Sequence, residues 1–171
     1  MSTKARVQAP GTRTGNLIAD SAMGLVPETL PHHLNLTVAI WDAGPLGAAD
    51  IELARLRNAR HVGCMMCQAV RYDVAVEDGL AEEQVSLIDD EYLDSELSDR
   101  QKLILQFVDL YALDPRPPQA SFQISLDAHF SAAEQVHLAL ALAYFNGSSR
   151  CAVALGGMPD SMSRMEIAVP R

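Results

Sequence analysis

Cysteine, aromatic side chains and strand-like patterns are all scarce in this sequence. Three cysteines occur among 171 residues, an odd number that does not suit a structural disulfide framework and instead predicts a reduced thiol protein. Aromatic residues make up 5% of the chain, so the core must consist mainly of Ala, Leu, Val, Ile and Met, which together favour helices over strands. No stretch alternates strictly between apolar and polar residues, and no segment repeats. An all-α fold is therefore expected.

Positive charge and long apolar runs are also lacking. The formal net charge is −9 and the pI is about 4.9, so the surface would repel the phosphates of nucleic acids and of anionic membranes. The longest uninterrupted apolar run, residues 138–145, is too short to span a bilayer. The first residues lack the apolar core of an export signal. We therefore expect a cytoplasmic protein that binds neither nucleic acid nor membrane.

The chain length suits a single domain over residues 1–171. At 171 residues, one hydrophobic core can bury most of the apolar surface without extra cross-links. Residues 1–16 mix Lys, Arg, Thr, Gly and Pro without periodicity and predict a flexible N-terminal arm, and residues 158–171 lack a helical period and predict a C-terminal tail. Between these ends, the apolar spacing indicates about six or seven helices in one bundle.

Local signals indicate where several helices begin and end. Ser98 and Ser131 each open a capping box, which predicts the start of a long helix at each of these positions. Asn146 and Gly147 predict an end or a kink in the second of these helices. Residues 148–155 are then expected to form a separate final helix.

Cys64 and Cys67 are the most informative residues, because they stand three positions apart at a predicted helix start. Residues 48–60 have the apolar spacing of one helix, Gly63 breaks it, and residues 64–77 predict a second helix. Cβ atoms three residues apart on a helix are roughly 5–6 Å apart, whereas a disulfide needs about 3.5–4.5 Å, so a small distortion closes the bond. The partial positive charge at a helix N-terminus also favours thiolates. The spacing predicts a dithiol that opens and closes.

Two charged residues are expected to frame this pair. If the two helices pack antiparallel about residues 61–63, Glu52 lies opposite Arg71. Arg71 also follows Cys67 by four residues, hence on the same face of the predicted helix, where its guanidinium would stabilise a Cys67 thiolate. We therefore expect Glu52, Arg71 and both cysteines to share one pocket.

The pattern of Glu52, eleven intervening residues, Cys64, two more residues and Cys67 resembles the alkylhydroperoxidase D group of the carboxymuconolactone decarboxylase family. The similarity covers most of residues 45–157 and continues beyond the cysteines through residues 79–83, 143–147, Arg150 and 154–156. The resemblance implies a helical bundle, a homo-oligomer, and reduction of a small hydroperoxide by the dithiol without a metal or another cofactor. It also implies an external dithiol reductant of the lipoyl or thioredoxin type.

The resemblance also assigns roles to individual residues. Cys67 would attack the peroxide to give a sulfenic acid, Cys64 would resolve it to a disulfide, and Glu52 would relay protons. The family normally carries a His four residues after the second Cys, where this chain has Arg71. An arginine can hold a thiolate but cannot shuttle a proton, so His61, three residues before Cys64, is a candidate for the missing titratable group.

The two cysteines could also serve roles other than peroxide reduction, and each role needs different surroundings. A zinc site would need two further Cys or His ligands, and only His61 is near in sequence. A thioredoxin-like motif would need a preceding strand within a βαβ unit, and the decarboxylase branch of the family lacks a redox dithiol. The pair could also be purely structural. Within the redox interpretation two classes stay open: a hydroperoxide reductase, or a redox sensor or thiol–disulfide binding protein without fast turnover.

Overall fold

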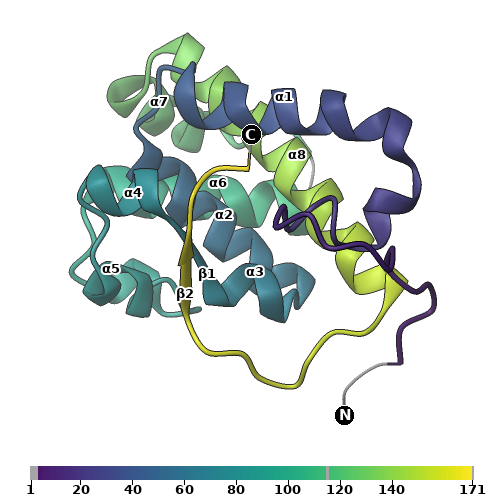
Figure 1. Cartoon of the computed structure of the whole chain (residues 1–171). Helices are drawn as coiled ribbons and strands as arrows, with labels where there is room; N and C mark the ends of the chain where they lie inside the picture. Colours follow the sequence, from purple (N-terminus) through teal and green to yellow (C-terminus); the bar gives the residue numbers. More distant parts are fainter. Residues whose placement is uncertain (1–3, 115, 171) are drawn as a thin grey trace.

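A computed structural model describes residues 4–114 and 116–170 of the chain. Its helices are α1 (Leu30–Asp42), α2 (Ala48–Val62), α3 (Met65–Ala69), α4 (Asp73–Glu77), α5 (Glu82–Ser86), α6 (Asp99–Leu113), α7 (Ala120–His129) and α8 (Ala132–Leu155) (Figure 1). Two short strands, β1 (Val70–Tyr72) and β2 (Met165–Ile167), and three single-turn 3₁₀ helices complete the described elements. The expected all-α class is confirmed, although the expected six or seven helices fall short of the eight found.

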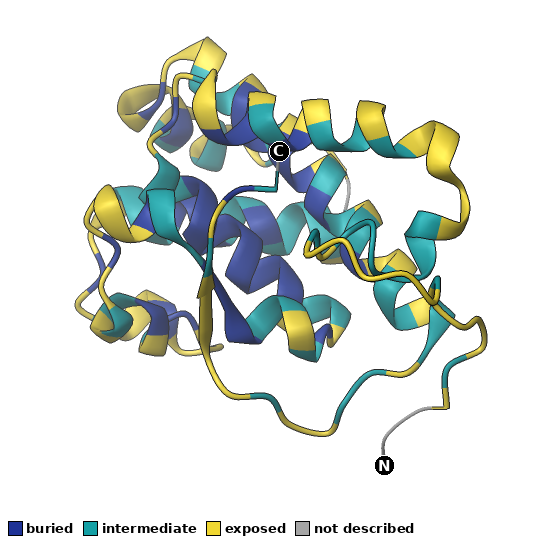
Figure 2. Ribbon diagram, in the orientation of Figure 1, coloured by how far each residue is buried: buried dark blue, intermediate teal, exposed yellow. Residues whose placement is uncertain are grey.

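Helix α2 is the centre of the core. Every residue from 51 to 59 is buried, because α2 packs against both α8 and α6 and against the short helices α3 and α4. Figure 2 shows this helix as a largely dark blue ribbon surrounded by helices with exposed outer faces. A helix enclosed on all sides holds its side chains in fixed positions, and polar residues on it must find partners inside the protein.

Most helix ends follow the sequence signals, with one exception. Gly63 adopts a left-handed conformation (φ 71°) and ends α2, and both predicted capping boxes are present, at Ser98 and at Ser131. The predicted break at Asn146 and Gly147 is wrong, because α8 runs unbroken from residue 132 to 155. Asn146 stays in the helix because its amide group donates to the Asn58 side chain at 2.7 Å and its carbonyl oxygen accepts from Arg150 at 2.8 Å.

The segment after the cysteines also departs from expectation. In place of one helix over residues 64–77, the chain forms the short helix α3, then the strand β1, then α4. β1 pairs in parallel with β2, with Arg71 opposite Glu166. Val70 and Tyr72 are β-branched and aromatic, the residue types that favour strands, and the C-terminal segment supplies the strand they pair with. A contact with a distant part of the chain therefore outweighs the helical periodicity of residues 64–77.

Both terminal segments lie against the domain. Arg6 donates its backbone N–H to the carbonyl of Leu155, at the end of α8, over 2.7 Å, and Figure 1 shows the purple N-terminal segment beside α8. At the other end β2 is hydrogen-bonded to β1, and Val169 beyond it is buried. The N-terminal segment is therefore attached at the end of α8, and the C-terminal segment at β1.

Among the described residues, α8 alone is long and apolar enough to cross a membrane, judged by length and composition. Its buried residues, among them Leu138, Leu142 and Phe145, belong to the hydrophobic core, and the helix packs against α2. One such helix is weak support for a membrane span, because core helices of soluble proteins can have the same length and composition.

Candidate redox site

The two cysteines form a disulfide at the start of α3. Their Cα atoms are 5.2 Å apart, within the usual range for a disulfide. Cys64 is the N-cap residue, and its sulfur accepts the backbone N–H of Cys67 at 3.3 Å. Cys64 is fully buried, whereas Cys67 is partly exposed. Cys67 is therefore the more accessible residue of the two.

Glu52 is fully buried in α2 and pairs with Arg55, one turn further along the same helix. Arg55 donates from Nε and Nη2 to the two carboxylate oxygens of Glu52, at 2.6 and 2.7 Å. The backbone N–H of Tyr72 donates to the same carboxylate at 3.3 Å. Burial works against the charge of Arg55, but the charge and hydrogen bonds of Glu52 outweigh it and raise the arginine pKa above its ordinary value. The pair is a fixed ionic unit.

Arg55 connects this ionic unit to the cysteine segment. Its Nη1 donates to the carbonyl oxygen of Cys67 and its Nη2 to that of Val70, each at 2.7 Å. The guanidinium also lies over the ring of Tyr72, 5.2 Å from the ring centre, and burial raises the pKa of Tyr72 to about 12. Charge-assisted hydrogen bonds are among the strongest in proteins. Arg55 therefore fixes the end of α3 and the backbone carbonyl of Cys67.

Ser149 of α8 supplies a hydrogen bond to the dithiol itself. Its hydroxyl donates to the sulfur of Cys67 at 3.4 Å, and the residue is 4% exposed. A hydroxyl held in this position donates equally to a thiolate, and a hydrogen bond to the charged form lowers the pKa of a thiol. Ser149 is therefore suited to stabilise a Cys67 thiolate after reduction.

The expected position of Arg71 is wrong. Arg71 lies in β1 rather than on a helix face shared with Cys67, and it pairs with Glu82 of α5 instead of Glu52, through Nε at 2.8 Å. Its Nη1 donates to the backbone carbonyls of Gln68 and Val70 at 2.7 and 2.9 Å. Arg71 thus joins β1 to α5 and braces the turn after α3, and it makes no direct contact with the sulfur atoms.

The expectation that His61 serves the dithiol is also not met. His61 points from the last turn of α2 toward α6, where its Nε2 lies 2.6 Å from an oxygen of Asp109. Asp109 also accepts hydrogen bonds from Arg57 at 2.7 and 3.0 Å and from the Tyr92 hydroxyl at 2.9 Å. Burial would raise the pKa of Asp109, but the hydrogen bonds from Arg57 and His61 lower it below its usual value.

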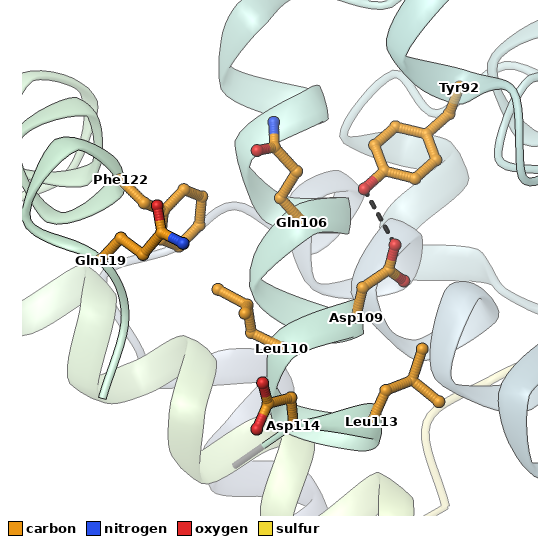
Figure 3. Close-up of a pocket in the computed structure, with 8 residues that line it drawn as sticks. All are labelled: Tyr92, Gln106, Asp109, Leu110, Leu113, Asp114, Gln119 and Phe122. Carbon is orange, nitrogen blue, oxygen red and sulfur yellow. Dashed lines mark hydrogen bonds between the residues drawn. The ribbon is translucent and has the colours of Figure 1, made fainter. Parts of the chain in front are cut away.

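A small cavity of about 400 Å³ lies next to this network, between α6 and α7. Figure 3 shows the hydroxyl of Tyr92 directed at Asp109 on one side and Phe122 on the other. The disulfide borders a different cavity, of about 550 Å³, and His61 is not among the described residues that line it. The Asp109 network is therefore a second, separate polar cluster that joins α2 to α6.

Sequence reasoning missed Arg55 and Ser149. Arg55 stands three residues after Glu52, a spacing that permits an ion pair on one helix, so a signal for it was present. Ser149 has no comparable signal, because 82 residues separate it from Cys67 and only the packing of α8 on α2 brings the two together. No group of three or more His, Cys, Asp or Glu residues that could hold a metal occurs in the described part of the chain.

Comparison with known proteins identifies the fold. No protein-family model and no curated protein matches the chain. A solved structure from Agrobacterium tumefaciens, a protein of unknown function provisionally named an antioxidant defence protein, AhpD, is similar to it with a TM-score of 0.67. The two are 23% identical, and the match covers 95% of this chain and 100% of the other. The chain therefore has an AhpD-like, all-α fold over nearly its whole length.

Proposed function

We propose that the protein is a thiol-dependent hydroperoxide reductase, in which Cys67 and Cys64 alternate between dithiol and disulfide. One observation carries the proposal: the Cys64–Cys67 disulfide borders a cavity of about 550 Å³. Of the two cysteines that line this cavity, Cys67 is partly exposed and Cys64 is buried, so a peroxide that enters meets Cys67 first. The AhpD-like fold is consistent with this function.

The reaction balances with the two thiols and one external reductant. The Cys67 thiol first loses its proton to water. The thiolate attacks the outer peroxide oxygen, the O–O bond breaks, the sulfur takes the OH group and becomes a sulfenic acid, and the leaving alkoxide takes a proton from water to depart as an alcohol. The Cys64 thiol then displaces water from the sulfenic acid and forms the disulfide. An external dithiol, of the thioredoxin or lipoyl type, reduces the disulfide and is itself oxidised.

The surrounding residues fit these steps in specific ways. The hydroxyl of Ser149 stabilises the Cys67 thiolate, and Arg55 fixes the backbone of Cys67 through its hydrogen bond to the Cys67 carbonyl. Glu52 neutralises Arg55 within the core and so holds the guanidinium in place, which makes it a positioning residue rather than a proton carrier. Arg71, which stands where the resembled family has a histidine, acts on the backbone through Gln68 and Val70.

A second candidate is a redox sensor or thiol–disulfide binding protein without rapid turnover. The observation in its favour is that Glu52 is engaged by Arg55 and Tyr72, while His61 is engaged by Asp109. Both residues that were expected to move protons for the dithiol are thus committed elsewhere. The two candidates differ in the rate of repeated peroxide consumption. A reductase is reduced again quickly by its external dithiol and consumes many peroxide molecules, whereas a sensor stays oxidised after reacting with one.

Mass spectrometry and stopped-flow kinetics test the proposal. The reduced protein should lose two hydrogen atoms, about 2 Da, after one equivalent of cumene hydroperoxide, within the peptide that contains both cysteines. Cys67→Ser should abolish peroxide consumption, and Cys64→Ser should leave a sulfenic acid on Cys67. Unchanged consumption in both variants would contradict the mechanism. Steady turnover with thioredoxin or dihydrolipoamide separates a reductase from a sensor.

We further propose a cytoplasmic homo-oligomer. Thiols persist in the reducing cytoplasm, as the redox cycle requires.

The proposed oligomer is supported by two apolar side chains on the surface of α8. Val136 and Leu140, one turn apart, are 59% and 60% exposed, and contact between two copies of the chain would cover them. Analytical ultracentrifugation should show an assembly that Leu140→Glu weakens, and a wild-type monomer at all concentrations would contradict this.

A further inference from the structure

The charges of this acidic protein are divided between two regions of the chain. Residues 4–19 contain Lys4, Arg6 and Arg13 and no acidic residue, whereas residues 73–99 contain eleven Asp or Glu residues and no Lys or Arg. Figure 1 shows the purple N-terminal segment beside α8, and α4 and α5, which belong to the acidic region, away from it at the left of the view. The N-terminal segment is therefore the basic part of a molecule whose formal net charge is −9.

The three cations of the N-terminal segment are available to a partner. Lys4, Arg6 and Arg13 are exposed, and within the described part of the chain none of them forms an ion pair. The cations of the interior are different, because they are bound to carboxylates, as Arg55 is to Glu52. The positive charge of the segment therefore faces solvent.

This basic segment forms one wall of the cavity beside the disulfide. Residues 7–9 and Arg13 line the cavity together with Cys67, whereas Lys4 and Arg6 do not line it. Positive charge is thus present both at the cavity wall and on the outer surface next to it. Charges outside a cavity cannot contact a small molecule bound within it, so they suit a partner larger than the cavity, such as another protein.

Specific contacts hold the segment in place beside the end of α8. The backbone N–H of Arg6 donates to the carbonyl oxygen of Leu155 at 2.7 Å. A Cβ on Gly156 would lie 2.7 Å from the carbonyl oxygen of Lys4, so a glycine at this position permits the close approach. These contacts use the backbone of the segment and leave its charged side chains exposed.

Apolar side chains at the same cavity complete the surface. Val7, Leu17 and Met66 line the cavity and are 39%, 41% and 36% exposed. An apolar centre within a polar rim is the usual composition of a protein interface. A neutral ligand would have no use for the surrounding cations, whereas an acidic protein would contact both parts of this surface.

We propose that the N-terminal segment, residues 4–13, is the docking surface for an acidic protein that reduces the Cys64–Cys67 disulfide. A partner with a negatively charged face is attracted to this segment and repelled by residues 73–99, so it approaches on the side of the cavity. Complementary charge of this kind raises the association rate and selects the partner. The assignment rests on the redox cycle of the proposed function, but not on which oxidant forms the disulfide.

The exchange with this partner is balanced by the two pairs of thiols. A thiolate of the partner attacks the sulfur of Cys67, the S–S bond breaks, and Cys64 leaves as a thiolate that takes a proton from water. The second thiol of the partner loses its proton to water, and its thiolate then attacks the partner's own sulfur in the mixed disulfide and releases the Cys67 thiolate. The partner is oxidised to a disulfide by two electrons, which reduce the Cys64–Cys67 bridge.

Two synthetic dithiol peptides that differ only in charge test this surface. Both contain the sequence Cys-Gly-Pro-Cys, which is flanked by glutamates in one peptide and by glutamines in the other. Acid quenching, alkylation and mass spectrometry of the Cys151→Ser protein give the rate constant of disulfide reduction by each peptide. The rate constant for the acidic peptide divided by that for the neutral one should fall roughly tenfold in Arg6→Gln/Arg13→Gln. This fall should disappear at about 1 M salt, where the Debye length is about 3 Å.

The matched control is Lys102→Gln/Arg116→Gln, which removes the same charge from positions outside the cavity and should leave the ratio at its value before substitution. An unchanged ratio in Arg6→Gln/Arg13→Gln, an equal fall in the control, or a fall that persists at high salt would overturn the proposal. If the ratio falls as expected while peroxides fail to oxidise the reduced protein, the docking surface stands and the peroxidase function fails.

Discussion

Glu52 and Arg55 show how one ionic pair can serve both the fold and the site. Both side chains are almost completely buried, at 0% and 5% exposure, and each donor or acceptor that faces the cysteine segment is used. Removing one member of such a pair leaves the other charge without a partner in the core, which costs far more than the pair itself contributes.

We therefore expect Glu52→Gln to lower the free energy of unfolding by about 3–5 kcal/mol, measured by urea denaturation of the oxidised protein. The matched control is Glu82→Gln, since Glu82 forms an ion pair with Arg71 but its side chain is 42% exposed. That change should cost less than about 1 kcal/mol. Equal effects of the two substitutions would mean that burial of the Glu52–Arg55 pair has no energetic importance.

Ser149 gives the second prediction at this scale. Loss of its hydroxyl in Ser149→Ala should raise the pKa of the Cys67 thiol by about one to two units, because a hydrogen bond to a charged group contributes about 1.5–3 kcal/mol. The pH dependence of iodoacetamide alkylation of reduced Cys151→Ser protein measures this value. Ser148→Ala is the neighbouring control, since the Ser148 hydroxyl donates to the carbonyl of Tyr144 and not to sulfur. An unaltered thiol pKa in Ser149→Ala would remove Ser149 from the site.

At the scale of single elements, the capping boxes at Ser98 and Ser131 can be compared to show what a titratable capping residue contributes to stability. They have the same geometry, but the third helical residue is Gln101 in α6 and Glu134 in α8. Hydrogen bonds from Arg100 and from Ser131 lower the pKa of Glu134 to about 2. A carboxyl group whose pKa is lower in the folded than in the unfolded state stabilises the fold at every pH above its unfolded-state pKa. This stabilisation disappears as the pH falls through the folded-state pKa.

Glu134→Gln should therefore lower the free energy of unfolding at neutral pH. The difference in this free energy between wild type and variant should shrink as the pH falls from about 4.5, the ordinary pKa of a glutamate, to about 2. Denaturant titrations across this range measure the difference. Gln101→Ala also loses a cap, but no proton is bound or released at that side chain, so its cost should be the same at every pH in the range. A pH-independent effect of Glu134→Gln would contradict the proposed linkage.

Elements that depend on local chemistry could be predicted from the sequence, and those that depend on distant partners could not. The capping serines and Gly63 act within a few residues, so their signals were sufficient. The prediction of one helix after Cys67 was wrong because β1 pairs with β2, which lies about a hundred residues later in the chain. The predicted contact between Glu52 and Arg71 was wrong for the same reason, because that prediction assumed that residues 64–77 form one helix.

At the scale of the whole molecule, the disulfide closes a very short loop and contributes little to the fold. The loop-entropy relation gives about 2 kcal/mol for a bridge between residues three apart, against the hydrophobic core formed by α2, α6 and α8. Reduction should therefore leave the far-ultraviolet circular dichroism unchanged and lower the melting temperature by only a few degrees, roughly 4–8 °C. Loss of cooperative unfolding after reduction would show that the bridge is structural.

The order in which the chain is synthesised gives the β1–β2 pairing a consequence for biogenesis. Residues 165–167 are synthesised after Cys67, yet they complete the sheet that follows the cysteines. A nascent chain therefore carries its thiols before their final surroundings exist, until β2 has been made. Products of premature termination would present the same thiols without the strand that borders them, which makes them the forms most exposed to unwanted cross-linking in the cell.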